Sequence, residues 1–492
     1  MAILSRPCPT CYLMTGFMPK LPATPLPLAL LCLACVSGGS HGAPDPFSLD
    51  TRIPAPRPLD QEPVQAPCLP PASDTALTLA QVVDEALCHH PQTREAWANA
   101  RVQANLAGVA RGAYLPTLNA ALGAGRRHQE VAGKRDDQRQ ETASLNFSYL
   151  LYDFGGRAAS LDSSQQLLEA LLATEDATRQ RVFLNALQAY YQVHATEAAV
   201  QAARESEQAA RESFKAAEAR YLAGTATPAD RLQAQTAFSQ ATLARIRAEG
   251  SLRNAQGALA HAMGRDAHVP VRLAPIQIDF PEPHFEADLA ALVAQAKARR
   301  PDLQAAEARY QAARSDVAAA RAAGMPSLSL GITPTYQALD GVTSRTGSIG
   351  LTLSIPLFTG FADSYRIRAA EARLDASAAQ REQLAQQVAL DVWQAYQNLL
   401  TATHTLRTTA DLLASAQASE QVALGRYRAG VGNILDLLNA QSALANARLQ
   451  RIQSAFDWHI SRASLAQAMG QMDKRLLDTG LSALPALSRN TP

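Results

Sequence analysis

The sequence is poor in aromatic residues and carries almost no net charge. Aromatic side chains make up 5% of its 492 residues although the hydrophobic fraction is 47%, because alanine supplies much of the apolar content. Alanine buries little surface, so this composition favours closely packed helices over one large globular core. Lys+Arg 45 and Asp+Glu 44 leave a formal charge of +1, which gives no overall field to attract nucleic acid or acidic substrates.

Long apolar runs and catalytic motifs are also missing. No uninterrupted hydrophobic stretch reaches about 18 residues, the length that a membrane-spanning helix needs, whereas short alternating strands remain compatible with the sequence. There is no Walker loop and no HExxH motif, and the CxxC spacings fall near the N-terminus. The adjacent His89 and His90 point about 100° apart on a helix, so they do not make a metal pair. We expect no enzymatic activity, no cofactor and no metal.

Residues 1–42 have the layout of a secretory signal peptide. Lys20 precedes an apolar segment over 28–36, and small residues follow it. Cleavage is expected between Gly38 and Ala43, and acylation of Cys35 is an alternative fate of this segment. Residues 43–76 are rich in proline and are expected to be extended.

Four of the six cysteines lie before residue 43, which leaves Cys68 and Cys88. In an exported protein these two thiols can form one disulfide that pins the proline-rich segment to the first helix. Two unpaired thiols are the alternative.

The rest of the chain contains one unit twice, with repeat 1 at 77–275, repeat 2 at 276–474 and a C-terminal tail at 475–492. Four motifs return in the same order at nearly constant separation, which indicates an internal duplication. The pairs are Ala113–Leu118 with Gly324–Leu328, Asp153–Arg157 with Leu357–Phe361, Arg220–Gln235 with Arg426–Gln441, and Ala262–Gly264 with Ala468–Gly470.

Each repeat contains a pair of predicted strands. Apolar residues alternate with small polar ones over 327–333 and 348–355, and less cleanly over 118–122 and 145–151. Period-two alternation predicts strands that are wetted on one face only.

The strands of each pair are expected to be joined by polar loops, over about 126–143 and 335–346. The first loop carries Arg126, Arg127 and Arg139 together with several acids. We expect it to be solvated, and contact with lipopolysaccharide phosphates is the alternative.

A very long helix is predicted after each strand pair. Neither glycine nor proline occurs from Arg157 to Ala223 or from Phe361 to Leu424. Helices of this length would reach roughly 100 Å and must pack sideways against others. In the second helix, large apolar residues recur every seven positions with small residues between them, which predicts a coiled-coil seam. The large residues are Val392, Leu399, Leu406 and Leu413.

Four strands per chain are too few to close a membrane barrel, since known barrels start at about eight. An open sheet in lipid would leave edge groups unpaired at several kcal/mol each. Two chains would give a barrel filled by side chains, and three chains give twelve strands around a lumen. If these strands span a membrane, several chains must therefore share one barrel, and the long helices that leave it would continue the water path as a second cylinder.

Over about residues 77–474 the sequence resembles the TolC family of trimeric outer-membrane channel-tunnels. The resemblance rests on Leu77–Leu87 with the following His90-Pro91, on the Leu-Pro-Thr-Leu strand entry at 115–118, on Asp153–Arg157, and on two Tyr-x-x-Gly-x-x-x-x-x-Asp elements at 221–230 and 427–436. It implies an α+β membrane protein in which long antiparallel helices form a coiled-coil α-barrel and three copies share a twelve-stranded β-barrel. It places this homotrimer in the outer membrane of a Gram-negative bacterium, with a long periplasmic portion. The implied partners are a periplasmic adaptor, an inner-membrane ABC transporter or other pump, and a protein or small-molecule cargo.

The two Tyr-x-x-Gly elements are predicted to be helix hairpins. Gly224 and Gly430 are expected to end the long helices as C′ glycines, and Asp230 and Asp436 lie near the start of the return helices, where a carboxylate favours the helix dipole. The resemblance places these turns at a closed periplasmic tip, where copies of Asp436 would ring the narrowest aperture.

The resemblance also assigns roles to neighbouring residues. It implies that Tyr427 ties adjacent tip helices together, with Asp230 as its partner, and that Arg220 and Arg426 belong to the turns. Gly432 and Asn439 stand where some members carry an arginine and a second acid, so one acidic ring is expected instead of two.

The junctions between barrel and helices are expected at aromatic, glycine and proline positions, some of them suited to an aromatic girdle. These positions are Phe154, Gly156, Phe358, Gly360, Pro116 and Pro326.

The expected function is a passive outer-membrane exit duct of a tripartite exporter. The junction sequence and the poor lipobox favour type I secretion of RTX-toxin-like proteins. Small-molecule drug or metal efflux is the alternative, and a periplasmic coiled-coil adaptor is a second one.

Overall fold

The computed structural model describes residues 45–49, 53, 68, 76–131, 133–276 and 288–472. The predicted signal peptide, the C-terminal tail and most of the proline-rich segment lie outside these residues. Residues 45–48 belong to a unit separate from the rest, and within it the Ser48 amide donates to the Asp45 carbonyl at 3.1 Å. All helices and strands described below belong to the second unit, which begins at Leu49.

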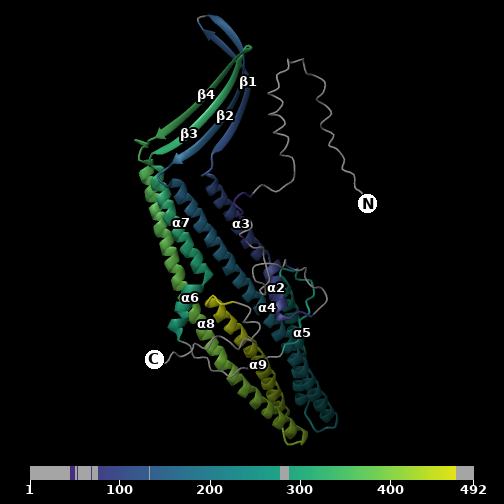
Figure 1. Ribbon diagram of the computed structural model, residues 1–492. Coiled ribbons are helices and arrows are strands. Elements are labelled where there is room, and N and C mark those ends of the chain that lie inside the picture. Colours follow the sequence, from purple (N-terminus) through teal and green to yellow (C-terminus); the bar gives the residue numbers. More distant parts are fainter. Residues whose placement is uncertain are drawn as a thin grey trace, which may run out of the picture. The chain divides into compact units, whose positions relative to one another are not determined.

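The described elements follow one order twice (Figure 1). The first half contains α2 (Leu79–His89), α3 (Pro91–Gly112), β1 (Thr117–Val131), β2 (Lys134–Tyr152), α4 (Gly156–Leu222) and α5 (Pro228–Ala262). The second half contains α6 (Leu289–Arg299), α7 (Pro301–Ala323), β3 (Ser327–Leu339), β4 (Val342–Ser354), α8 (Ala362–Arg428) and α9 (Ile434–Ala468). The duplication read from the sequence is therefore a duplication of structure.

A proline opens the second helix of each half. His90 is extended, with φ −63° and ψ 132°, and Pro91 is the first residue of α3. The residue before a proline is disfavoured in the helical region, and proline at the first helical position loses no hydrogen bond. Arg300 and Pro301 repeat this arrangement between α6 and α7.

The strands form one antiparallel sheet in the order β1-β2-β3-β4, so β2 and β3 join the two halves. Positions along each strand alternate between two faces. One face carries large apolar residues that are exposed in the single chain, among them Leu118 at 62%, Leu122 at 75% and Ile349 at 74%. The other face carries small polar residues, including Asn119, Ser144, Asn146, Ser329, Thr333, Ser348 and Thr352.

The strands are longer than predicted, and the expected loops over 126–143 and 335–346 are wrong. β1 pairs with β2 without interruption from Thr117 opposite Ser148 to Val131 opposite Lys134. Strand pairing satisfies the backbone groups whatever the polarity of the side chains, so charged residues continue the ladder.

The turn between β3 and β4 is a two-residue hairpin turn. Asp340 and Gly341 have φ of 46° and 83°, both positive as a type I′ turn requires. The Asp340 carboxylate also accepts a hydrogen bond from the Arg139 amide on β2 at 2.7 Å. An Asp-Gly pair is a strong hairpin signal that the polar composition of this segment had obscured.

The two uninterrupted long helices are confirmed. α4 and α8 each have 67 residues, which corresponds to about 100 Å of helix. α4 packs against α3, α5, α7 and α9, and α8 packs against α6, α7 and α9. The predicted seam of α8 is buried along its length at Val388, Val392, Ala395, Leu399, Ala402, Leu406, Thr409 and Ala416.

The largest apolar core joins α2 to α4, α5 and α9. Its fully buried side chains include Phe183, Leu187, Tyr190, Leu259 and Met263. A backbone bridge between Leu77 and Leu273 closes this region, with the Leu77 amide donating to the Arg272 carbonyl at 2.9 Å.

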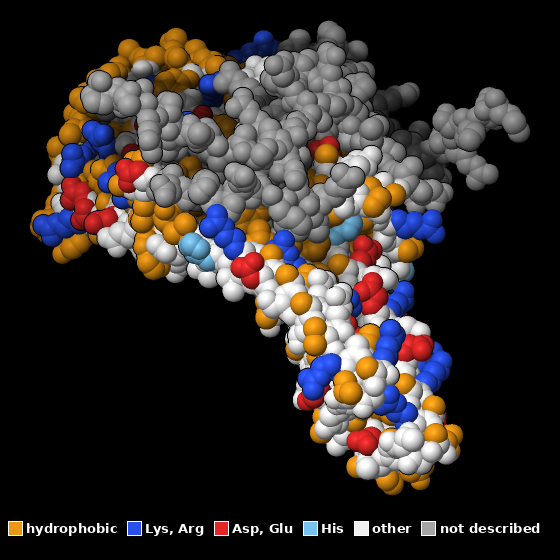
Figure 2. All heavy atoms as spheres, turned by 90° about the horizontal axis from the view of Figure 1, so that it is seen from below, with side chains coloured by type: hydrophobic (Ala, Val, Ile, Leu, Met, Phe, Trp, Pro, Cys, Tyr) orange, Lys and Arg blue, Asp and Glu red, His pale blue; other side chains and the backbone are white. Residues whose placement is uncertain are grey.

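None of the helices in the described part of the chain combines the length and the apolar character needed to cross a membrane. On the face seen in Figure 2, acidic and basic side chains are interspersed, in keeping with the near-zero net charge.

Candidate functional site

The first tip turn joins α4 to α5. Gly224 has φ +73°, and its amide donates to the Tyr221 carbonyl at 3.0 Å, as expected of a C′ glycine. Thr227 then caps α5, because its hydroxyl accepts from the Asp230 amide at 3.2 Å while the Asp230 carboxylate accepts from the Thr227 amide at 3.0 Å. This reciprocal pair is a capping box, so the Asp230 carboxylate is engaged at the start of its own helix.

The second tip turn joins α8 to α9 with a different cap. Gly430 again has φ +78°, but here the side chain of Asn433 caps the helix by accepting from the Leu435 amide at 3.2 Å. Asp436 lies in the first turn of α9 and is exposed, as is Asn439 one turn later. Because Asn433 supplies the cap, the Asp436 carboxylate of the second turn is left exposed to solvent. In the first turn, the Asp230 carboxylate is bound to Thr227.

Gly432 is closely surrounded by backbone. A Cβ atom at this position would lie 2.9 Å from the Tyr427 amide nitrogen and 3.0 Å from the Arg426 carbonyl carbon. Real Cβ atoms essentially never show the first distance, and the second is tighter than nine in ten real Cβ contacts, so this turn conformation does not accommodate an arginine side chain. The glycine found here, where some family members carry an arginine, therefore agrees with the space that the turn leaves for a side chain.

Arg220 and Tyr427 connect the two tip turns. The Arg220 guanidinium carbon lies 4.2 Å from the centre of the Tyr427 ring, and Nη2 donates to the Tyr427 carbonyl oxygen at 2.6 Å. Tyr427 is 6% exposed and packs with Ala217, Ala234, Ile434 and Leu437. The sequence placed Arg220 in a turn but gave no signal of this long-range contact.

The predicted contact between Tyr427 and Asp230 is not among the hydrogen bonds within this chain's described residues. Asp230 is held by Thr227, and Tyr427 lies beneath Arg220. The capping box uses only the Oδ2 oxygen of the Asp230 carboxylate, so a contact with a neighbouring copy through Oδ1 would leave the box in place.

A shallow groove runs between α8 and α9 beside the second turn. Its walls are mostly small side chains, and Arg426, Asp436 and Asn439 border it. Arg426 is the repeat counterpart of Arg220, yet it is exposed and lines this groove. The small residues are Ala418, Ser419, Ala423, Gly432, Ala440 and Ala443.

Asp153 and Arg157 fix the passage from β2 into α4. The Asp153 carboxylate accepts from the Arg157 amide at 2.7 Å and from its Nε at 3.2 Å, while Nη1 donates to the Leu150 carbonyl at 2.7 Å. Positive φ values of 52° at Phe154 and 87° at Gly155 turn the chain between strand and helix. The arginine thereby satisfies strand carbonyls at the end of the sheet.

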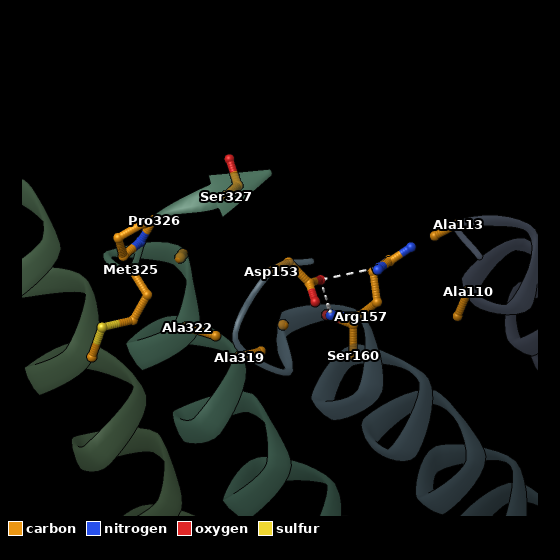
Figure 3. A pocket seen from close by; sticks show the side chains of 12 residues that line it. Ala110, Ala113, Asp153, Arg157, Ser160, Ala319, Ala322, Met325, Pro326 and Ser327 are labelled. Carbon is orange, nitrogen blue, oxygen red and sulfur yellow. Dashed lines mark hydrogen bonds and ion pairs between the residues drawn. The ribbon is translucent and has the colours of Figure 1, made fainter. Parts of the chain in front are cut away.

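Figure 3 shows this ion pair beside a hollow that separates the ends of α3, α4 and α7. Ala110 of α3 and Ala113, the residue that follows α3, lie on one side of Arg157, and Ala319 and Ala322 of α7 lie on the other side. Small side chains let α3 and α7 each pack closely against α4 where the helices approach the sheet.

The second junction uses the same backbone device. Gly360 and Phe361 have φ of 63° and 64°, and α8 begins at the next residue. The Thr359 hydroxyl donates to the Asp363 carboxylate at 2.8 Å, which holds the first turn of α8. Pro116 and Pro326, the residues predicted at the strand entries, immediately precede β1 and β3.

Aromatic side chains gather at both junctions and are exposed. Tyr152 and Phe154 meet edge to face with ring centres 4.9 Å apart, and Phe358 and Phe361 do so at 5.5 Å. Phe154 is 50% exposed and Phe358 76%. Exposed aromatic pairs at the sheet end suit an aromatic girdle.

Cys68 and Cys88 form a disulfide, with their Cα atoms 5.6 Å apart. Cys88 is buried near the end of α2. Of the two alternatives that the sequence left open, the structure has the bridge and not the free thiols.

A buried polar cluster between α4 and α9 was missed by the sequence analysis. Tyr191 stacks on His459 with ring centres 5.2 Å apart, and the Arg462 guanidinium lies over Trp458 at 5.5 Å. Burial raises the pKa of Tyr191 to about 12 and lowers the pKa of His459 to about 4. The cluster arises from the meeting of two helices far apart in sequence, which no local pattern records.

Within the described residues, no group of three or more His, Cys, Asp or Glu side chains is arranged to hold a metal ion. His90 instead caps α3, with its Nδ1 accepting from the Gln92 amide at 3.2 Å.

The sequence matches the profile of the outer membrane efflux protein family over residues 82–265 and 292–471. Protein CyaE of Bordetella pertussis is 31% identical over 421 residues, covering 84% of this chain and 89% of the relative. Outer membrane protein OprJ of Pseudomonas aeruginosa is 30% identical over 411 residues, covering 80% and 84%.

A solved membrane protein from Pseudomonas aeruginosa has the same fold, with a TM-score of 0.72 and 26% identity, covering 80% of this chain and 93% of that one. The family match spans both structural repeats, and the relatives are covered nearly end to end. The chain therefore belongs to the outer membrane efflux protein family, and it is a channel protein of the Gram-negative outer membrane with a long periplasmic portion.

Proposed function

We propose that three copies of the chain assemble into the passive exit duct of a tripartite exporter and that its cargo is a protein. In this proposal the strands form one twelve-stranded barrel in the outer membrane, and the long helices continue the duct through the periplasm. A periplasmic adaptor and an inner-membrane ABC transporter complete the exporter and supply the energy.

The edges of the sheet carry the argument for assembly. β1 and β4 each pair on one side only within the described chain, and an exposed apolar face adjoins them. Unpaired edge amides and carbonyls cost several kcal/mol each in lipid, so the edges need partners. Other copies of the same sheet supply those partners, and twelve strands are enough to leave a lumen for cargo.

Exposed apolar stripes on the helices support the same assembly. On α3, Val102, Leu106 and Val109 are 59%, 49% and 71% exposed and recur at helical spacing. On α5, Leu243 and Ile246 are 45% and 51% exposed. Stripes of this kind suit packing against helices of neighbouring copies.

The relation to CyaE, a type I secretion outer membrane protein, supports a protein cargo. The family description and the relation to OprJ support small-molecule efflux as the second candidate. A periplasmic adaptor is ruled out, because the chain is an outer-membrane protein.

The assembly is tested with purified protein. Heat-modifiable trimers from the outer-membrane fraction and stepwise conductance in planar bilayers are expected. Monomers under gentle solubilisation, together with liposomes that stay tight to ions, would overturn the proposal.

The cargo is tested by complementation. The gene is expressed in Bordetella pertussis lacking CyaE, and adenylate cyclase toxin is measured in the medium. In parallel, drug susceptibility is measured in Pseudomonas aeruginosa lacking OprJ. Restored toxin export without restored drug resistance supports the protein cargo, and the reverse pattern supports efflux.

A further inference from the structure

We propose that the cross-strand pair Arg126–Arg139 forms a binding site for the phosphate groups of lipopolysaccharide on the lipid-facing side of the barrel, with Arg345 as a separate contact closer to the apolar band. The proposal rests on the trimeric barrel proposed above. It replaces the solvated loop expected from the sequence, because these arginines lie on strands.

The register of the sheet places the three side chains on one face. Arg126 of β1 lies directly opposite Arg139 of β2. Arg126 shares its face with Leu118 and Leu122, since positions an even number apart along a strand point the same way. On β4, Arg345 lies on the same face as Ile349. Ile349 pairs with Ile332, Ile332 with Phe147, and Phe147 with Leu118 of β1, so this is the apolar face of all four strands.

The position along the strands matches a membrane surface. From Leu353 to Arg345, β4 covers about 26 Å, comparable with the apolar band of about 25 Å in outer-membrane barrels. Arg345 lies opposite Tyr336, in register with Leu122, at the end of this band, and the Arg126–Arg139 pair lies about 13 Å farther along the strands. The helices leave from the other end of the strands, so this end faces the outer leaflet.

The charges around the Arg126–Arg139 pair are incompletely compensated, because Asp137, the acid beside the pair on this face, is engaged by His128. Arg139 forms an ion pair with Glu141 at 2.8 Å, with its side chain 73% exposed. Arg126 and Arg345 are exposed and have no carboxylate partner in the described part of the chain. Like charges directly opposite on a strand pair are destabilising, so the Arg126–Arg139 pair favours a bound anion.

The guanidinium group identifies that anion as phosphate. Its planar array of donors matches phosphate oxygens in a bidentate manner. At the surface of the outer leaflet, phosphate is presented by lipid A, whose acyl chains would cover the apolar face below the arginines. Lipid A would therefore contact both the apolar residues and the arginines of this face, whereas a free phosphate ion would contact only the arginines.

Arg127 provides a matched control. It neighbours Arg126 in sequence but lies on the opposite face, across from Gln138. Neutralising it changes the net charge of the strand by the same amount without touching the proposed site.

The test compares wild-type trimers with Arg126→Gln/Arg139→Gln, Arg345→Gln and Arg127→Gln trimers in detergent. Binding of bisphosphorylated lipid A and of dephosphorylated lipid A is measured by native mass spectrometry, with inorganic pyrophosphate as a competitor. We expect roughly tenfold weaker binding of bisphosphorylated lipid A to the double variant, a smaller loss in Arg345→Gln and no loss in Arg127→Gln. Dephosphorylated lipid A should bind wild type as weakly as bisphosphorylated lipid A binds the double variant.

Equal binding to wild type and to the double variant, or equal loss in Arg127→Gln, would overturn the inference. Pyrophosphate binding as tight as that of lipid A would overturn the lipid as the source. Trimer content and conductance are measured on every preparation first. If the wild-type trimer conducts but binds both forms of lipid A equally, only this inference is refuted. If the wild type neither trimerises nor conducts, both the proposed duct and this inference are refuted.

Discussion

The guanidinium of Arg220 at the end of α4 lies over the ring of Tyr427 at the end of α8, 4.2 Å from its centre. The same arginine donates to the Tyr427 carbonyl at 2.6 Å, so one side chain holds the two tip turns of a chain together. If these turns close the duct, the contact favours the closed state.

Arg220→Ala should therefore raise the open fraction of the channel. The lost stacking and hydrogen bond amount to about 1–2 kcal/mol per chain, enough for a severalfold change in the open-to-closed ratio. Single-channel recordings in planar bilayers measure this ratio. Arg428→Ala removes an exposed charge from the end of α8, next to Tyr427, and should leave the ratio unchanged. Identical recordings from both variants would refute a latch at Arg220.

Two glycines of the tips should respond differently to alanine. At Gly224 a Cβ meets nothing within 4 Å, so the cost comes only from φ +73° and should be about 1–2 kcal/mol. At Gly432 the same methyl group would meet backbone at 2.9 Å, so the turn must move. Gly432→Ala should speed limited proteolysis at the tip far more than Gly224→Ala. Equal cleavage rates would show that the Gly432 turn is not tightly packed.

The acidic residues of the two tip turns should affect different properties, Asp230 the stability of the fold and Asp436 the ion selectivity of the channel. Asp230→Ala removes a capping box and should cost about 1 kcal/mol of stability with unchanged ion selectivity. Asp436→Ala leaves its helix capped by Asn433 and should reduce cation selectivity and divalent-cation block, because it removes an exposed carboxylate from the proposed ring. Reversal potentials in a salt gradient measure selectivity. An Asp436→Ala channel with unaltered selectivity and block would exclude the ring.

Much of this fold was predictable because its signals are local and periodic. The seam of α8, the glycines that end both long helices and the prolines before β1 and β3 each act through their near neighbours in sequence. The same holds for the duplication, since each copy carries its own caps and turns. The strand ends were mispredicted for a related reason: charged residues conceal strand periodicity, and only the Asp340-Gly341 turn marked the hairpin.

The contacts that join the halves could not be predicted. Arg220 with Tyr427 and Tyr191 with His459 are pairs far apart in sequence, brought together by helix crossings. Their residue types are equally common on solvated helix faces. At the second tip turn, α9 is capped by Asn433 and not by Asp436. This also follows from the geometry of the turn and not from composition.

The disulfide should contribute measurably to stability. Cys68 and Cys88 are separated by 20 residues, and closing a loop of that size stabilises a fold by roughly 3 kcal/mol in the chain-entropy picture. Cys88→Ser and Cys68→Ser should both lower the melting temperature, Cys88→Ser by more because it also buries a hydroxyl, and dithiothreitol should lower that of wild type about as far as Cys68→Ser does. A reductant effect that persists in the variants would place the redox sensitivity elsewhere.

Acid should weaken the contact between α4 and α9 through His459. Burial, aided by the Arg462 charge, lowers the pKa of His459 to about 4, whereas an unfolded histidine titrates near 6.5. Between these values the unfolded chain binds more protons, so the stabilisation is complete above about pH 6.5 and is lost as the pH falls toward 4, by at most about 3 kcal/mol.

His459→Phe preserves an aromatic partner for Tyr191 and should reduce the acid dependence of urea unfolding. A residual dependence is expected from His194, whose pKa is also lowered by burial. His404→Phe, at an exposed position of α8, should retain the full wild-type dependence, and the same acid slope in both variants would rule out His459 as its source.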